Sequence, residues 1–215
     1  SADPETDPFL PDATLLAMYR ELCKIRRIDE RMLGKQRQGK VGFFGTITGQ
    51  EATPIAAAFA TEPTDWIFPA LRETSIMVCR GFPLATWLAQ AYGNERDILR
   101  GRQMPSHMSG RSVNYVSCSS CIGPQIPQAV GAAYAAKLRG DSMVAIGFSG
   151  DGATSEPAFH SAMTFAERWK APVVVVCQNN HWSISVPTAK QTASKTIAIK
   201  ARAYDRARNS AGSYV

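Results

Sequence analysis

The sequence lacks the features that mark several large classes of protein. No apolar run approaches the roughly 18 residues that cross a membrane, and the acidic, proline-rich start is unlike a signal or transit peptide. Neither G-x-x-x-x-G-K nor G-x-G-x-x-G occurs, which disfavours the usual mononucleotide and dinucleotide sites. No internal repeat is present. The 215 residues are 45% hydrophobic and 20% charged, a composition that suits one globular α/β domain.

Cysteine is scarce and odd in number. Five cysteines without a secretory signal favour reduced thiols in the cytoplasm, or in the mitochondrial matrix if the source is eukaryotic. "CSSC" at 118–121 is formally C-x-x-C, but a zinc site needs two more ligands at suitable spacing. No second C-x-x-C and no H-x₃₋₅-H pair occurs, so unpaired loop thiols are favoured over zinc.

Positive charge is in excess, at +6 net, with a pI near 9.2. This balance suits phosphate ligands, nucleic acid or an acidic protein partner. Aromatic and basic residues do not alternate in any short run, so nucleic-acid binding is disfavoured. Most of the positive charges are therefore assigned to solvated helix faces, and no membrane partner is expected.

Apolar periodicity predicts mostly helices in the first 141 residues. A stripe at helical spacing predicts a helix over 14–38 with Gly39 as its C-terminal cap, and residues 1–13 are expected to form a flexible arm. The stripe consists of Leu15, Met18, Leu22, Ile25, Ile28 and Met32. Further helices are predicted at 49–60, at 83–94 with Gly93 closing it, and at 124–141 with Gly140 as its C-terminal stop. A short buried strand is predicted at 65–73 and a loop at 101–114.

The next segments predict a parallel sheet. "SMVAIGFS" (142–149) and "APVVVVCQNN" (171–180) predict buried apolar strands, separated by a helix at 155–170. Continuous apolar strands joined by a helix are typical of a right-handed βαβ unit in a parallel sheet. The predicted fold class is therefore α/β, a parallel sheet with helices on both faces.

Two polar motifs follow these strands. Asp151 lies between Gly150 and Gly152 after the first strand, and Asn180 ends the second. Ligands of parallel sheets bind beyond the carboxyl ends of the strands, so the two side-chain oxygens can converge. Carboxylate and amide oxygens suit Mg²⁺, and the glycines allow backbone to approach a phosphate. The pattern predicts a Mg²⁺–diphosphate site; the alternative for Asp151 is a helix cap.

G-D-G followed by N-N after one βαβ crossover resembles the thiamine diphosphate motif. The stretches "AYGNERDILRGRQMPSHMS", "QIPQAVGAAYAAK", "GDGATSE" and "SISVPTAKQT" are similar to the α subunit of the E1 component of 2-oxo acid dehydrogenase complexes. "GRQMP" is closer to the branched-chain (2-oxoisovalerate) type than to the pyruvate type. The similarity covers about residues 15–204.

The resemblance implies a thiamine diphosphate-binding fold and a set of site residues. Asp151 and Asn180 would ligate Mg²⁺ by side chain, and Trp182 by its backbone carbonyl. The cofactor would contact Arg72, Ser120, Ile122, Gly150, Asp151, Gly152, Ala153 and Asn180. Arg72 could instead be a surface ion-pair partner. His107 is a candidate for the substrate channel, with a plain loop residue as the alternative.

The resemblance also implies partners and a reaction. The family forms an α₂β₂ heterotetramer with a β subunit, decarboxylates a 2-oxo acid and passes the acyl unit to the lipoyl domain of E2. Leu71 stands where the family usually has tyrosine, and Pro124 removes a threonine hydroxyl of a potassium site. The expected domain spans 14–204 and is incomplete at its C-terminus, with an atypical tail at 205–215. The alternative function is a truncated, non-catalytic chain that acts only through subunit association.

Overall fold

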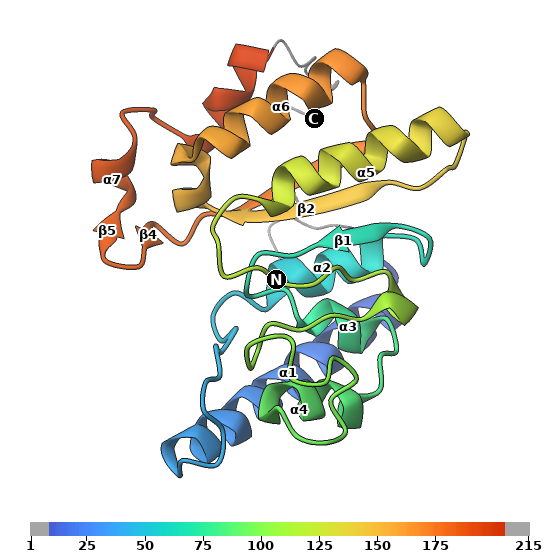
Figure 1. The fold of residues 1–215 in the computed structure, drawn as a ribbon, viewed down its shortest axis with the longest axis vertical. Helices are drawn as coiled ribbons and strands as arrows, with labels where there is room; N and C mark the ends of the chain where they lie inside the picture. Colours follow the sequence, from blue (N-terminus) through green and yellow to red (C-terminus); the bar gives the residue numbers. More distant parts are fainter. Residues whose placement is uncertain (1–8, 205–215) are drawn as a thin grey trace.

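The chain folds around a three-stranded parallel sheet (Figure 1). The computed structural model describes residues 9–204. The strands are β1 (Trp66–Phe68), β2 (Ala145–Gly150) and β3 (Val173–Gln178), in the order β1-β2-β3. Both pairs are parallel. The predicted α/β class and the parallel sheet are confirmed.

Helices cover both faces of this sheet. Figure 1 shows α5 (Gln125–Arg139) and α6 (Pro157–Trp169) on one side. On the other side lie α1 (Asp12–Arg37), α2 (Ala52–Ala60), α3 (Ser75–Cys79) and α4 (Leu84–Tyr92). Because successive strand residues face opposite ways, Ile146 and Phe148 join the core with α1–α4, and Ala145 joins the core with α5 and α6.

Short elements complete the described residues. Three 3₁₀ segments span Arg111–Val113, Asp151–Ser155 and Ile197–Tyr204. An antiparallel hairpin of β4 (Trp182–Ser183) and β5 (Val186–Pro187) leads into α7 (Thr188–Gln191). Among the described residues, no helix is both long and apolar enough to cross a membrane.

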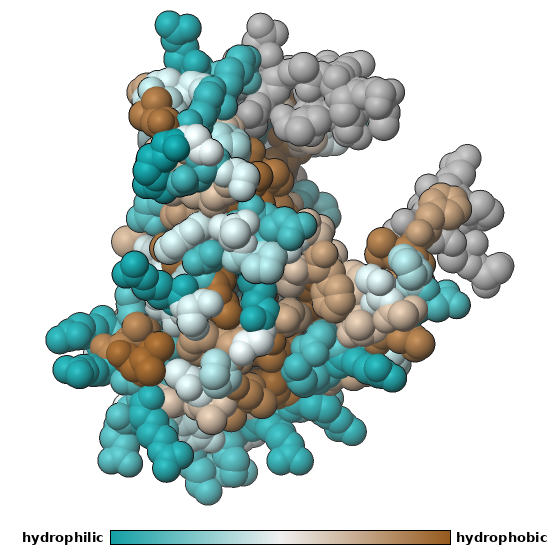
Figure 2. All heavy atoms as spheres, turned by 90° about the vertical axis from the view of Figure 1, so that its right-hand side faces the viewer, coloured by the Kyte–Doolittle hydropathy of each residue, from teal (hydrophilic) through white to brown (hydrophobic). Residues whose placement is uncertain are grey.

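The start of α1 presents apolar side chains to solvent. Ile25 and Met32 are buried, and Met18, Leu22 and Ile28 pack against the same core, which confirms most of the predicted stripe. Leu15, Leu16 and Tyr19 are exposed. Figure 2 shows apolar residues on the arm that projects at its right-hand side. The apolar stripe of α1 therefore extends beyond the part of the helix that packs against the core.

Several predicted boundaries were wrong. α1 begins at Asp12, inside the expected arm, and its N-cap Pro11 offers no side-chain cap. Asp151–Ser155 forms a 3₁₀ turn, so α6 begins at Pro157. The short α3 and the β4–β5 hairpin were not predicted. Predicted glycine caps at 39, 93 and 140 all have positive φ, as left-handed caps require. The predicted tail at 205–215 lies outside the described residues.

The prediction that β3 is a buried strand was wrong for part of its length. Val173 is buried against α5 and α6, but Val174 on the opposite face is 46% exposed. Within the described residues β3 is an edge strand, and the α1–α4 layer covers that face mainly over β1 and β2. An apolar run alone does not distinguish an edge strand from a central one.

Close packing of α5 on β2 depends on small residues. A Cβ added at Gly147 would lie 3.2 Å from Ile126 Cδ1 and 3.3 Å from Ala129 Cβ. The buried face of α5 includes the small residues Ala129, Ala133 and Ala136, whereas Gly131 is exposed. Gly147 therefore sets how closely this helix approaches the strand.

We expect Gly147→Val to lower the free energy of unfolding by about 1–3 kcal/mol, because the added methyls overpack this contact. Gly131→Ala is the matched control, since nothing lies within 4 Å of its Cβ position. It should raise stability by about 1 kcal/mol through helix propensity. Urea unfolding measures the free energy of unfolding of both variants. Equal changes in the two would contradict the packing argument.

Candidate functional site at the carboxyl edge of the sheet

The sheet register brings the two polar motifs to one edge. Gly150 pairs with Gln178 at the ends of β2 and β3. Asp151 follows the first of these residues, and the asparagine pair follows the second. Binding sites of parallel sheets lie at this edge.

Asp151 is a buried carboxylate that is only partly satisfied. The residue is 2% exposed. Its Oδ2 accepts a hydrogen bond from Thr188 Oγ1 at 2.7 Å and one from Gln191 Nε2 at 3.4 Å. Its Oδ1 has no partner. A buried oxygen without a partner costs about 1–3 kcal/mol, so this position fits a cation or another polar group.

The same edge collects other unpaired buried atoms. Besides Asp151 Oδ1, the described residues contain four buried side-chain oxygens without a partner: Glu73 Oε2, Ser75 Oγ, Ser149 Oγ and Gln178 Oε1. Ser149 and Gln178 lie at the ends of β2 and β3, Glu73 contacts Gln178, and Ser75 begins α3. Buried polar groups are normally paired, so this grouping indicates the place of a polar ligand.

Asn180 is exposed and turned toward its own backbone. Its Oδ1 accepts from the Trp182 amide at 3.0 Å, and Asn179 Oδ1 accepts from His181 N at 3.0 Å. These two turns lead into the β4–β5 hairpin, where the Trp182 side chain is exposed. The structure thus brings Thr188 and Gln191 to Asp151, and the joint role of Asp151, Asn180 and Trp182 as metal ligands stays a prediction.

The two glycines beside Asp151 have different surroundings. Nothing lies within 4 Å of a Cβ added at Gly150. A Cβ at Gly152 would overlap Ser183 Oγ and lie 2.7 Å from Ser183 Cβ. Ala153, next along the 3₁₀ turn, is buried. Gly150 therefore faces open space, and Gly152 is needed for the close approach of the hairpin.

An apolar cavity of about 500 Å³ contains several predicted site residues. Ser120, Ile122 and His107 line it, as does Leu71, which precedes Arg72. Phe43, Met104 and Ile184 supply apolar wall. Ile184, at the tip of the hairpin, is 98% exposed and has φ +54°, an unusual backbone for a β-branched residue.

His107 and Ser120 form a hydrogen-bonded pair in this cavity. His107 is buried, with Nδ1 3.0 Å from the Pro105 carbonyl and Nε2 2.6 Å from Ser120 Oγ. A carbonyl only accepts, so Nδ1 carries the proton in the neutral ring. Nε2 then accepts from the Ser120 hydroxyl. The backbone carbonyl thus orients both side chains, and the role of His107 in a substrate channel stays a prediction.

The two cysteines of "CSSC" have different environments. Cys118 is buried beside Tyr115, with its Sγ 3.6 Å from the phenol oxygen. Cys121 is exposed and lines the cavity. Pro124, where the family pattern has threonine, occupies the N-cap position of α5.

Arg72 contacts the protein backbone through one of its N–H donors. The side chain is half-buried, and its Nη1 donates to the backbone carbonyl of Thr46. It is not in an ion pair among those found in the described residues. The alternative of a surface ion-pair partner is therefore not what the structure shows, and its contact with a phosphate stays a prediction.

The buried acid Glu73 was not predicted from the sequence. It is 1% exposed, and its Oε1 accepts from Gln178 Nε2 at 3.3 Å, which links the end of β3 to the segment after β1. Burial raises the pKa of Glu73 to about 7, against the opposing effect of nearby hydrogen-bond donors and the Arg72 charge. Thr188 and Gln191 were also missed. No local pattern marks such contacts, because the partners are far apart in sequence.

The chain matches a known protein family. The sequence model of the family described as "Dehydrogenase E1 component" matches residues 19–207. The chain belongs to this family.

Curated relatives of the chain are named as α subunits of 2-oxoisovalerate dehydrogenase. The chain is 41% identical over 187 residues to 2-oxoisovalerate dehydrogenase subunit alpha 2, mitochondrial, of Arabidopsis thaliana, covering 87% of this chain and 40% of the relative. It is 39% identical over 202 residues to 2-oxoisovalerate dehydrogenase subunit alpha, mitochondrial, of Bos taurus, covering 94% and 44%. The corresponding Homo sapiens protein is 38% identical, covering 94% and 45%. The chain spans less than half the length of these relatives.

Gly152→Ala should lower the free energy of unfolding by about 1–3 kcal/mol, because its methyl group would displace Ser183 and with it the hairpin. Gly150→Ala is the control at the other side of Asp151. It should leave stability unchanged or raise it by up to about 1 kcal/mol. Equal losses in urea unfolding for the two variants would contradict the assigned packing.

Glu73→Gln should change the pH dependence of stability. The folded-state pKa is raised from 4.5 to about 7, so the protonated form favours folding, and this contribution is lost as pH rises through about 7. By linkage the wild type should lose about 3 kcal/mol relative to Glu73→Gln between pH 4 and pH 8. Urea unfolding at both pH values measures it. Parallel pH curves for the two proteins would contradict the assignment.

Proposed function

We propose that the chain is the α-type subunit of a thiamine diphosphate-dependent 2-oxo acid dehydrogenase of the branched-chain type. The supporting observation is the unpaired Oδ1 of buried Asp151 at the sheet edge where Gly150 pairs with Gln178. Membership of the E1 family and relatives named 2-oxoisovalerate dehydrogenase support the same activity. The thiamine diphosphate-binding form of the α/β fold is part of this proposal.

The donor set fits a divalent cation carrying a diphosphate. Mg²⁺ requires hard oxygen ligands, and Asp151 Oδ1 is such an oxygen without a protein partner. Asn180 and the Trp182 carbonyl are the further proposed ligands, and binding requires the Asn180 amide to leave its present turn. Open space at Gly150 admits phosphate oxygens. Arg72 would contribute N–H donors that suit a phosphate.

The residues of the cavity would act on the rest of the cofactor and on the substrate. When bound, thiamine diphosphate supplies the nucleophile and electron sink for decarboxylation. Ser120 and Ile122 would contact its aminopyrimidine side, and the hydrogen bond to His107 orients the Ser120 hydroxyl. The apolar wall of Phe43, Leu71 and Met104 would exclude water and accommodate a branched aliphatic side chain. His107 is the proposed substrate-lining residue.

The proposal also includes partner proteins and a cellular location. The relatives are named as subunits, which supports assembly of this chain with a β subunit and delivery of the acyl unit to the lipoyl domain of E2. Their names also include "mitochondrial", which supports the matrix in a eukaryotic source.

Asp151→Ala should abolish Mg²⁺-dependent binding of thiamine diphosphate, and Asn180→Ala should weaken it at least tenfold, because each removes a proposed metal ligand. Asp141→Ala is the matched control, since Asp141 is exposed, pairs with Arg139 and precedes the opposite end of β2. It should bind as the wild type does. Isothermal titration calorimetry with and without Mg²⁺ measures the affinities.

The wild-type chain distinguishes the enzyme from the non-catalytic alternative. Decarboxylation of 3-methyl-2-oxobutanoate is measured with and without an added β subunit. Cofactor binding and turnover with the β subunit support the enzyme, whereas assembly without cofactor binding supports the non-catalytic alternative. Binding that persists unchanged in Asp151→Ala would overturn the metal assignment.

A further inference from the structure

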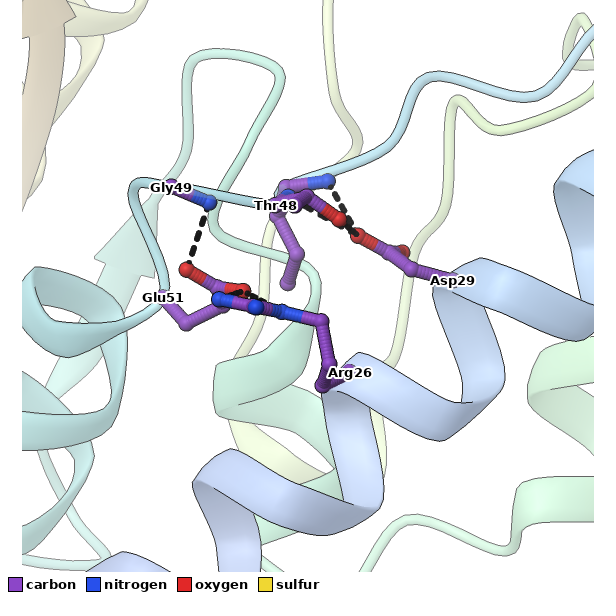
Figure 3. A network of polar contacts seen from close by, with 6 residues as sticks. Arg26, Asp29, Thr48, Gly49 and Glu51 are labelled. Carbon is purple, nitrogen blue, oxygen red and sulfur yellow. Dashed lines mark hydrogen bonds and ion pairs between the residues drawn. The ribbon is translucent and has the colours of Figure 1, made fainter.

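A network of polar contacts joins α1 to the loop before α2 (Figure 3). Asp29 on α1 is 3% exposed. Its Oδ2 accepts three hydrogen bonds at 2.8 Å, from Ile47 N, Thr48 N and Thr48 Oγ1. A second contact lies beside it, where Glu51 accepts from Arg26 at 2.6 Å and from Gly49 N at 2.7 Å. The loop at 47–49 is thus held to α1 at two points.

The first of these points also determines the orientation of one peptide group. The Thr46–Ile47 peptide donates through its N–H to Asp29 and accepts through its C=O from Arg72 Nη1. In a trans peptide the N–H and C=O point in opposite directions. When Asp29 holds the N–H, the carbonyl must therefore face away from α1, toward the guanidinium. The Glu51 contact reaches the loop at Gly49 and makes neither of these bonds.

Three hydrogen bonds make this carboxylate a firm anchor. Burial raises the pKa of Asp29, and the hydrogen bonds from Thr48 and Ile47 oppose that rise. Hydrogen bonds to a charged group are the stronger kind. The peptide group therefore has little freedom to rotate, and the Thr46 carbonyl is a fixed acceptor for Arg72.

We propose that Asp29 is a positioning residue for Arg72, acting through the Thr46–Ile47 peptide, so that the guanidinium is preorganised for a diphosphate. The bond to Thr46 uses one of the five N–H donors of arginine. The others can then meet phosphate oxygens without first ordering a long side chain, which would cost conformational entropy. This inference rests on the proposed function only for the identity of the ligand.

The test uses two measurements, of which one needs no cofactor. Phenylglyoxal modification of Arg72, followed by peptide mass spectrometry with exposed Arg27 as the internal reference, reports how firmly the guanidinium is held. Asp29→Ala should accelerate modification of Arg72 at least threefold. Glu51→Gln is the matched control, a buried acid on the neighbouring contact, and should leave the rate unchanged. If Asp29→Ala does not fold, the isosteric Asp29→Asn replaces it, with a smaller increase expected.

The second measurement is the Kd for thiamine diphosphate with Mg²⁺. Asp29→Ala should raise this Kd about tenfold in the otherwise wild-type chain and less than twofold when Arg72→Ala is already present. An unchanged modification rate of Arg72 in both Asp29 variants overturns the inference. So does a Kd effect that persists in full without Arg72, since it would indicate a general structural role. A wild type that binds no thiamine diphosphate defeats the proposed function instead, and the modification rates then decide the inference alone.

Discussion

The parallel pairing of β2 with β3 is the constraint on which the rest of the structure depends. Its register ends with Gly150 opposite Gln178, so the chain leaves both strands at the same edge. That edge receives Asp151, the asparagine pair and the hairpin that follows them. The α5 helix packs its Ala129 against Gly147 of β2, and α5 and α6 together cover this face of the two strands.

Polar groups at this edge are less satisfied than buried groups usually are. Asp151, Glu73 and Gln178 each keep one oxygen without a partner, and burial raises the pKa of Glu73 to about 7. Such arrangements lower the stability of a fold, and proteins tolerate them mainly where a ligand or a reaction needs them. The surrounding structure compensates with tightly packed apolar cores on both faces of the sheet.

Sequence periodicity predicted the elements far better than their contacts. The stripe through Ile25 and Met32, the glycine caps and the two apolar strands were identified correctly, because each depends on neighbours within a few residues. The exposure of Val174 was not predicted, because it depends on which helices cover that part of the sheet. The cavity residues Ser120 and His107 were expected near a ligand, but their mutual hydrogen bond was not.

The sequence by itself determined the α/β class, the position of the G-D-G and N-N motifs after neighbouring strands, and membership of the E1 dehydrogenase family. Those features follow from local periodicity, turn chemistry and motif spacing. Only the tertiary structure decided that Thr188 bonds Asp151, that Glu73 meets Gln178 and that one peptide links Asp29 to Arg72. Each of these contacts joins residues more than 35 positions apart or passes through a third segment. Their geometry depends on how helices and loops pack, which no local pattern specifies.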